Sequence, residues 1–164
     1  MRKPYKFFLV SSLLLIYLVI AAGAIVRMTG SGMGCPDWPK CFGYIIPPIE
    51  RSQLEWKADY AYKEGQVIII DESLLVAKMD FITKMNYNSD NWKPYTKHDY
   101  SIFNPTHTWI EFLNRLLGAI AGLATLFLFI TALFRIKKDP ITTILSFVVV
   151  LGMGFQAWLG KTVV

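Results

Sequence analysis

Charged residues are scarce in this sequence of 164 residues. Asp, Glu, Lys and Arg together make up 18% of it, whereas hydrophobic residues make up 54% and the mean hydropathy is +0.38. This composition excludes an ordinary water-soluble domain. The net charge of +5 does not indicate nucleic-acid binding, because the basic residues form no stripe with interleaved aromatic residues. The sequence also contains no repeat or low-complexity tract, which excludes a repeat architecture.

The apolar residues are concentrated in three blocks. They run over Phe7–Val26, about Ile110–Phe134 and about Ile141–Leu159. Each block is close to the ~20 residues that a helix needs to cross a hydrocarbon core of ~30 Å. The sequence therefore predicts an all-α integral membrane protein with three transmembrane helices, in contact with the lipid bilayer.

The first block is interpreted as a membrane anchor. The residues Ala22-Gly23-Ala24 have the small-x-small form of a cleavage site, so a cleaved signal peptide is the alternative. The apolar core of a signal peptide has ~7–15 residues, and this block is longer. We therefore expect the block to be retained as a helix.

Basic residues flank the blocks on one side. They are Arg2, Lys3 and Lys6 before the first block, and Arg135, Lys137 and Lys138 between the second and the third. The stretch from Met28 to Trp109 holds eight basic and ten acidic residues. Cytoplasmic segments carry the excess of Lys and Arg, so the amino terminus is predicted to be cytoplasmic.

This orientation divides the chain into five segments. We expect a cytoplasmic tail and first helix (1–27), an extracytoplasmic loop (28–109), a second helix (110–134), a cytoplasmic turn (135–139) and a third helix (140–164).

The loop opens with a glycine-rich turn that contains the two cysteines of the chain. Three glycines within five residues allow positive φ and a sharp turn, and Pro36 and Pro39 stiffen the segment between Cys35 and Cys41. Cysteines that lie close in sequence on the oxidising side of a membrane predict a disulfide. A structural staple and a reversible dithiol that passes electrons both remain open.

The rest of the loop is predicted to contain two short amphipathic helices, Ile49–Lys63 and Glu72–Asn86. The second would place Leu75, Met79 and Ile82 on one face. The segment Tyr87–Pro105 mixes Asn, Asp, Pro and aromatic residues without periodicity, so it is predicted to be a loop. Within it, His98 has no second ligand at metal spacing and is expected to be a solvated surface residue.

The second block carries polar and small residues on one stripe of the expected helix. The stripe is made of His107, Glu111, Asn114 with Arg115, Gly118 and Gly122. Leu, Ile and Phe occupy the rest of the helix. Ionisable and amide groups one to two turns inside a membrane segment are costly and by default indicate a functional site. We therefore expect this stripe to face protein or a ligand.

Structural explanations of the same residues remain open. Thr108 and Glu111 fit a capping box, and Glu111 with Arg115 fits an i, i+4 ion pair. Gly118 and Gly122 fit a helix-packing pattern. In the third block Gly152, Gln156 and Gly160 also share a stripe, which is expected to pack against the second helix.

Three segments together resemble the heme A synthase (cytochrome oxidase assembly) family. They are V-R-M-T-G-S-G-M-G-C-P-D-W-P-K-C after the first block, E-F-L-N-R-L-L-G in the second and Q-A-W-L-G-K-T-V-V in the third. The resemblance covers about residues 7–44 and 104–164. It implies eight membrane helices in two four-helix halves, so this chain would be part of one half-bundle in the inner (plasma) membrane.

The resemblance also implies a reaction, the oxidation of the C8 methyl of heme O to the formyl of heme A. A heme b cofactor would sit in the carboxy-terminal half and the substrate heme O in the amino-terminal half. This chain would then be a fragment or subunit, inactive without the missing helices. Implied partners are the carboxy-terminal half, a heme O synthase and cytochrome oxidase subunits.

Five residues correspond to family positions. Cys35 and Cys41 correspond to the cysteine pair of the outer loop. Glu111 corresponds to the carboxylate of an E-x-x-H-R motif, which implies a catalytic role, and Arg115 corresponds to the arginine. The histidine of that motif, an axial heme ligand in the family, is Asn114 here, and an amide is a poor iron ligand.

Other residues have supporting roles in this interpretation. Arg27 and Arg115 are candidates to pair with heme propionates, since a guanidinium matches carboxylate geometry. Gly118 and Gly122 would leave room for the ring. His107 could reach a heme only near the outer surface, and no other metal ligand is predicted, because the transmembrane part has no other histidine.

Two other function classes remain open. The first is a membrane thiol–disulfide redox protein that uses Cys35 and Cys41 to relay electrons to a quinone. The second is a non-catalytic oxidase assembly factor that holds a partner with its outer loop.

Overall fold

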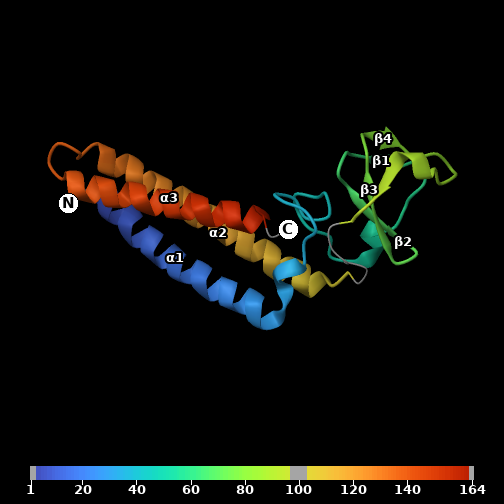
Figure 1. Ribbon diagram of the computed structural model, residues 1–164, viewed down its shortest axis with the longest axis horizontal. Coiled ribbons are helices and arrows are strands. Elements are labelled where there is room, and N and C mark those ends of the chain that lie inside the picture. Colours follow the sequence, from blue (N-terminus) through green and yellow to red (C-terminus); the bar gives the residue numbers. More distant parts are fainter. Residues whose placement is uncertain (1–2, 97–102, 163–164) are drawn as a thin grey trace. The chain divides into compact units, whose positions relative to one another are not determined.

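The computed structural model describes residues 3–96 and 103–162 and divides the chain into two compact units (Figure 1). The helical unit comprises residues 1–28 and 113–163, and the strand unit comprises residues 29–112. His98, expected to be a solvated surface residue, lies outside the described residues.

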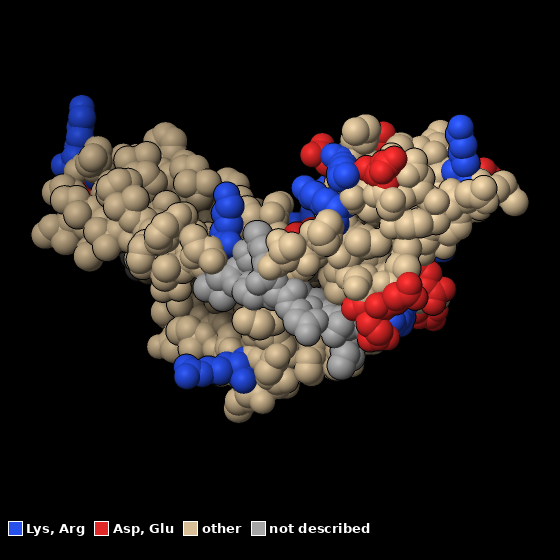
Figure 2. All heavy atoms as spheres, turned by 45° about the vertical axis from the view of Figure 1, so that its right-hand side comes forward, with Lys and Arg blue, Asp and Glu red and all other residues tan. Residues whose placement is uncertain are grey.

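Three helices are long and apolar enough to cross a membrane, as predicted. They are α1 (Lys3–Thr29), α2 (Pro105–Leu133) and α3 (Pro140–Thr162). Their apolar side chains are largely exposed, and the face of these helices seen in Figure 2 is almost free of charged residues. Exposed Leu, Ile and Phe on uncharged helices are what a lipid environment requires.

Helix α2 begins five residues before the predicted block because Asn104 caps it. The Asn104 Oδ1 accepts hydrogen bonds from the N–H groups of Thr106 (3.0 Å) and His107 (3.3 Å). Pro105 occupies the first helical position, where its missing N–H is no loss. The capping box proposed for Thr108 and Glu111 is therefore wrong, since Thr108 lies inside the helix.

The helices of the helical unit contact one another where α1 begins, α2 ends and α3 begins. Tyr5, Leu128 and Ala132 form a buried cluster, and the Thr143 hydroxyl of α3 donates to the Ala132 carbonyl of α2 at 3.0 Å. The Arg135 guanidinium lies 5.3 Å from the centre of the Tyr5 ring.

The glycines of α3 do not make the close packing that was predicted, and those of α2 do not make the packing that was left open as an alternative. A Cβ built at Gly118, Gly122, Gly152 or Gly160 would meet no atom of the described residues within 4 Å. The prediction that the Gly152 stripe packs closely against α2 is wrong for the described part of the chain, because the contact between α2 and α3 is made near their connection instead.

The strand unit contains two small antiparallel sheets. The sheet β2-β3-β5 joins Val67–Ile70, Ser73–Ala77 and Trp92–Pro94, and the pair β1-β4 joins Ala61–Tyr62 and Phe81–Ile82. Short 3₁₀ turns lie at Ser31–Met33, Arg51–Leu54 and Ser89–Asn91. Charged side chains gather on this unit in Figure 2.

These sheets overturn the prediction of two amphipathic helices, and with it the all-α class. Asp71 and Glu72 both have positive φ (47° and 64°) and form the two-residue turn between β2 and β3. Such a turn matches the twist of paired strands. A run of β-branched residues such as Val67–Ile70 favours a strand. The loop predicted over Tyr87–Pro105 is wrong in part, because it contains β5.

Strand β2 is buried on both faces. Val67 and Ile69 belong to one core cluster with Phe42, and Ile68 belongs to another with Trp92. Successive side chains of a strand point to opposite faces, so one short strand supplies both cores.

Candidate functional site

The predicted disulfide between Cys35 and Cys41 is present. It closes the disulfide turn, which we define as residues 30–44. Within the turn, Asp37 Oδ2 accepts from the Gly43 N–H at 2.8 Å, and the backbones of Cys41 and Tyr44 exchange hydrogen bonds at 2.9 and 3.1 Å. The cysteines are 0% and 1% exposed. The turn is thus a fixed structure with its sulfur atoms buried.

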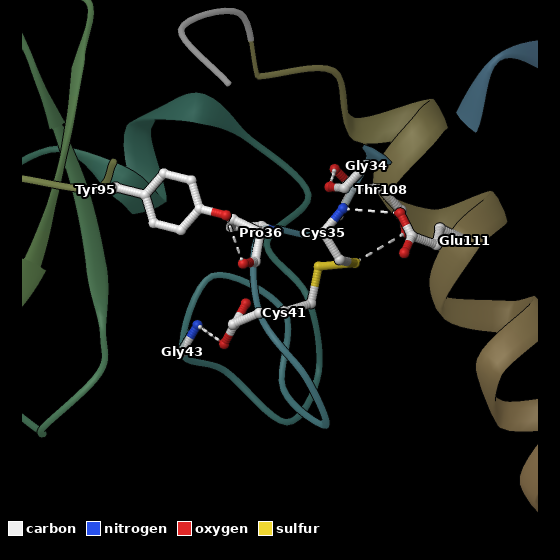
Figure 3. Close-up of a disulfide and its surroundings, with 9 residues drawn as sticks. Gly34, Cys35, Pro36, Cys41, Gly43, Tyr95, Thr108 and Glu111 are labelled. Carbon is white, nitrogen blue, oxygen red and sulfur yellow. Dashed lines mark hydrogen bonds between the residues drawn. A yellow bond between two sulfur atoms is a disulfide. The ribbon is translucent and has the colours of Figure 1, made fainter. Parts of the chain in front are cut away.

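The disulfide turn lies against the first two turns of α2 (Figure 3). A Cβ on Gly34 would lie 2.5 Å from the His107 carbonyl oxygen, so only glycine allows this approach. The Thr108 hydroxyl donates to the Gly34 carbonyl at 2.9 Å. The Sγ atom of Cys35 lies 3.7 Å from the Thr108 carbonyl oxygen.

Glu111 makes a fourth contact between the turn and α2. Its Oε2 accepts the backbone N–H of Cys35 at 2.9 Å, and its side chain is turned toward the disulfide turn in Figure 3. Only 5% of Glu111 is exposed. A hydrogen bond to a carboxylate is stronger than one between neutral groups, and burial strengthens it further. Glu111 therefore holds the turn, and it does not point into bulk water.

The disulfide turn is also attached to the sheet of the strand unit. The Tyr95 hydroxyl donates to the Pro36 carbonyl at 2.9 Å, and the Val67 N–H donates to the Phe42 carbonyl at 3.1 Å. Gly43 has a φ of +79°, and a Cβ there would lie 2.4 Å from the Gly65 carbonyl oxygen. The turn therefore connects the start of α2 to the strands.

Burial of the disulfide turn changes one ionisable side chain. Removal from water, together with the neighbouring Tyr60 and Tyr62, raises the pKa of Tyr44 to about 12. The phenol therefore stays neutral at physiological pH.

The remaining predicted site residues lie in the helical unit. Asn114 and Arg115 are partly exposed on α2, and Arg27 is exposed in the last turn of α1. The Oδ1 of Asn114 is buried and has no hydrogen-bond partner in the described part of the chain. A Cβ built at Gly118 or Gly122 would meet no atom of the described residues within 4 Å.

The predicted site residues that the structure describes do not provide the ligands of a resident heme. Within the described residues no group of three or more His, Cys, Asp or Glu could hold a metal ion. His107 is the single histidine in the membrane helices, and it lies in the first turn of α2. Asn114 offers an amide where iron binding needs imidazole, thiolate or thioether, so a resident heme does not fit these residues.

The sequence did not reveal Gly34, Tyr95 or the true contact of Thr108. Gly34 stands directly before Cys35, and that position was the one available signal. Gly34 and Thr108 are 74 positions apart in the sequence, so the hydrogen bond between them could not be predicted without the three-dimensional structure.

Comparisons with known proteins point to one family. A family model described as "Cytochrome oxidase assembly protein" matches residues 6–88 and 84–164. A protein named Heme A synthase from Flavobacterium johnsoniae is 29% identical over 160 residues, covering 97% of this chain and 40% of its own length. Another of that name from Orientia tsutsugamushi is 27% identical over 167 residues, covering 96% and 39%.

A shorter segment is more similar to another protein of that name. The Heme A synthase of Shewanella oneidensis is 49% identical over 37 residues, which is 23% of this chain and 11% of that protein. The chain thus spans at most about 40% of the length of these curated relatives. No solved structure matches it.

Proposed function

The chain belongs to the cytochrome oxidase assembly protein family, and on that premise we propose that it takes part in heme A synthesis. It is an integral membrane protein. In this proposal it positions heme O, the substrate, while the C8 methyl group is oxidised to the formyl group of heme A. The remaining helices implied by the family, including those that hold a resident heme, are needed for activity.

One observation carries this proposal, the stripe that begins at Glu111 and continues along an open face of α2. Glu111, Gly118 and Gly122 follow one another at i, i+7 and i+11, which places them on the same side of a helix. No atom of the described residues fills the space beside the two glycines. A flat hydrophobic ring needs such a face, with few polar groups at one end to orient it.

The chain's own residues would bind and orient the substrate. Arg115, and Arg27 at the end of α1, supply guanidinium groups for propionates. Glu111 supplies a buried carboxylate fixed by the Cys35 N–H, which can accept a proton or orient a water molecule near the methyl group. Since a resident heme does not fit these residues, no step through one is assigned to this chain.

We further propose the orientation that the basic residues favour. The amino terminus and the 135–139 turn would be cytoplasmic, and residues 28–109 would be extracytoplasmic. The disulfide supports this orientation, because disulfides persist on the oxidising side of a membrane. A heme O synthase and cytochrome oxidase subunits are the partners that the function would require.

The alternative of a thiol–disulfide relay is not favoured. Exchange requires a thiolate to reach a sulfur atom, and Cys35 and Cys41 are 0% and 1% exposed. Burial supports the staple role for this pair. A non-catalytic assembly factor would differ in one measurable way, because the purified full-length protein would carry no heme.

The test is chromatography of hemes extracted from membranes that contain variants of the full-length protein. Glu111→Ala and Glu111→Gln should both accumulate heme O, and Glu64→Ala, which removes an exposed carboxylate of the strand unit, should make heme A normally. Gln keeps an oxygen that can accept the Cys35 N–H. Normal heme A in Glu111→Gln would show that Glu111 only positions the turn, and normal heme A in Glu111→Ala would remove it from the reaction.

A further inference from the structure

Large apolar side chains are exposed around the disulfide turn. Ile45 is 79% exposed and Ile46 is 68% exposed, and Met33, Trp38 and Ile49 are also exposed. Residues 29–49 contain only two charged residues, Asp37 and Lys40. Exposed apolar residues gathered in one segment with few charges indicate a surface that is covered by something apolar.

These side chains cannot turn inward, because the backbone that carries them is fixed. The disulfide and the paired Cys41 and Tyr44 hold the turn immediately before Ile45 and Ile46, and the prolines that follow, Pro47 and Pro48, are buried. Burial of one isoleucine side chain contributes ~1.5–3 kcal/mol. Burial of Ile45 and Ile46 against an apolar neighbour would therefore stabilise this segment.

The attachment of this segment to α2 indicates where it would lie when α2 spans a membrane. Gly34 packs against His107, and Cys35 is bonded to Glu111, the sixth residue after Pro105 in a membrane-spanning helix. Six residues of helix rise ~9 Å. With Pro105 at the level of the headgroups, the turn would be attached to α2 near the depth where headgroups give way to hydrocarbon.

We propose that the segment Met33–Ile49 inserts Trp38, Ile45 and Ile46 into the lipid leaflet where α1 ends and α2 begins. Lipid at the boundary between headgroups and acyl chains would cover these side chains. Tryptophan and tyrosine are enriched at that boundary, and Tyr44 and Trp38 lie in the same turn. Apolar side chains on a segment with few charges bind there by burying their apolar area. Because the turn is bonded to the start of α2, its exposed surface is continuous with the end of a membrane-spanning helix.

The test uses nitroxide labels on the full-length protein in vesicles of phosphatidylethanolamine and phosphatidylglycerol. Ile45→Cys and Ile46→Cys are labelled one at a time, and mass spectrometry checks that Cys35 and Cys41 remain paired. The matched control is Ile82→Cys, because Ile82 is 72% exposed but lies in β4, away from the start of α2 in Figure 1. Collision with oxygen, which concentrates in lipid, is compared with collision with a water-soluble nickel chelate.

At positions 45 and 46 we expect oxygen collision to dominate and nickel collision to be several-fold weaker than at position 82. Nickel collision equal to that at position 82 would overturn the proposal, because the segment would then face water. Labels shielded from both reagents would also overturn it, because protein would then cover the surface. Neither result would affect the heme measurements that test the proposed function.

A second measurement avoids new cysteines. Brominated lipids quench tryptophans that lie in the leaflet, so Trp38→Phe should lower the quenched fraction of the fluorescence. An unchanged quenched fraction would contradict insertion of Trp38.

Discussion

The backbone N–H of Cys35 donates to the carboxylate of Glu111 at 2.9 Å, although 76 positions separate the two residues. Both partners are buried, and a medium of low dielectric constant strengthens a hydrogen bond to a carboxylate. This bond attaches the disulfide turn to the residue that the proposed function places nearest the chemistry. Substitutions in the turn should therefore change the position of the Glu111 carboxylate.

Thr108→Val tests the neighbouring contact. The change keeps the shape of the side chain but removes the 2.9 Å bond to the Gly34 carbonyl, which contributes ~1 kcal/mol. If the turn then separates from α2 more often, reduction of the disulfide under native conditions should be about fivefold faster. The rate of thiol alkylation in the presence of a reductant measures this.

The matched control for that change is Thr131→Val. Thr131 also lies on α2, but its hydroxyl donates to the Leu128 carbonyl within the same helix. The rate of disulfide reduction should not change in this variant. Equal rates in the two variants would show that the bond between Thr108 and Gly34 does not hold the turn.

Gly34→Ala should have a larger effect. Its Cβ would lie 2.5 Å from the His107 carbonyl oxygen, a backbone atom that cannot move without disturbing the helix. Such overpacking costs ~1–3 kcal/mol. Limited trypsin digestion should therefore cleave the strand unit several-fold faster, whereas Gly23→Ala, where nothing lies within 4 Å, should digest like the wild type. Equal digestion of both variants would contradict the close approach.

The three membrane helices could be predicted from the sequence because their signal is local. A run of ~20 apolar residues has few alternatives to a membrane helix. The start of α2 was missed by five residues because it depends on the side chain of Asn104, which lies outside the apolar block. The disulfide was likewise predictable from two neighbouring cysteines.

The strands could not be predicted in the same way. The run Val67–Ile70 is buried on both faces, so it lacks the alternation of apolar and polar residues that indicates a strand. Leu75, Met79 and Ile82 have helical spacing, but Met79 and Ile82 are exposed, so that spacing does not reflect burial. The contact of Glu111 with Cys35 was hidden for another reason, because it joins distant positions through a backbone group.

Tyr44 predicts a pH dependence of the strand unit. Burial raises its pKa to about 12 in the folded state, against 10.0 for an exposed tyrosine. The stability that the neutral phenol contributes is therefore fully present below pH 10 and is lost as the pH rises toward 12. Relative to Tyr44→Phe, whose ring does not titrate, the wild type should become less resistant to trypsin across this window. A constant difference between the two proteins from pH 8 to 11 would contradict the shift.

Gly118→Leu and Gly122→Leu test the open face of α2. A Cβ at either position would meet no atom of the described residues within 4 Å, and leucine is a good residue for a membrane helix, so the protein should still fold and form its disulfide. If heme O lies on this face, each side chain would overlap it. Overlap of that kind costs ~1–3 kcal/mol, so heme A should fall by about tenfold. Gly23→Leu places the same side chain in open space on α1 and should leave heme A unchanged. Normal heme A in both α2 variants would show that the substrate lies elsewhere, because a bound macrocycle and a leucine cannot occupy the same space.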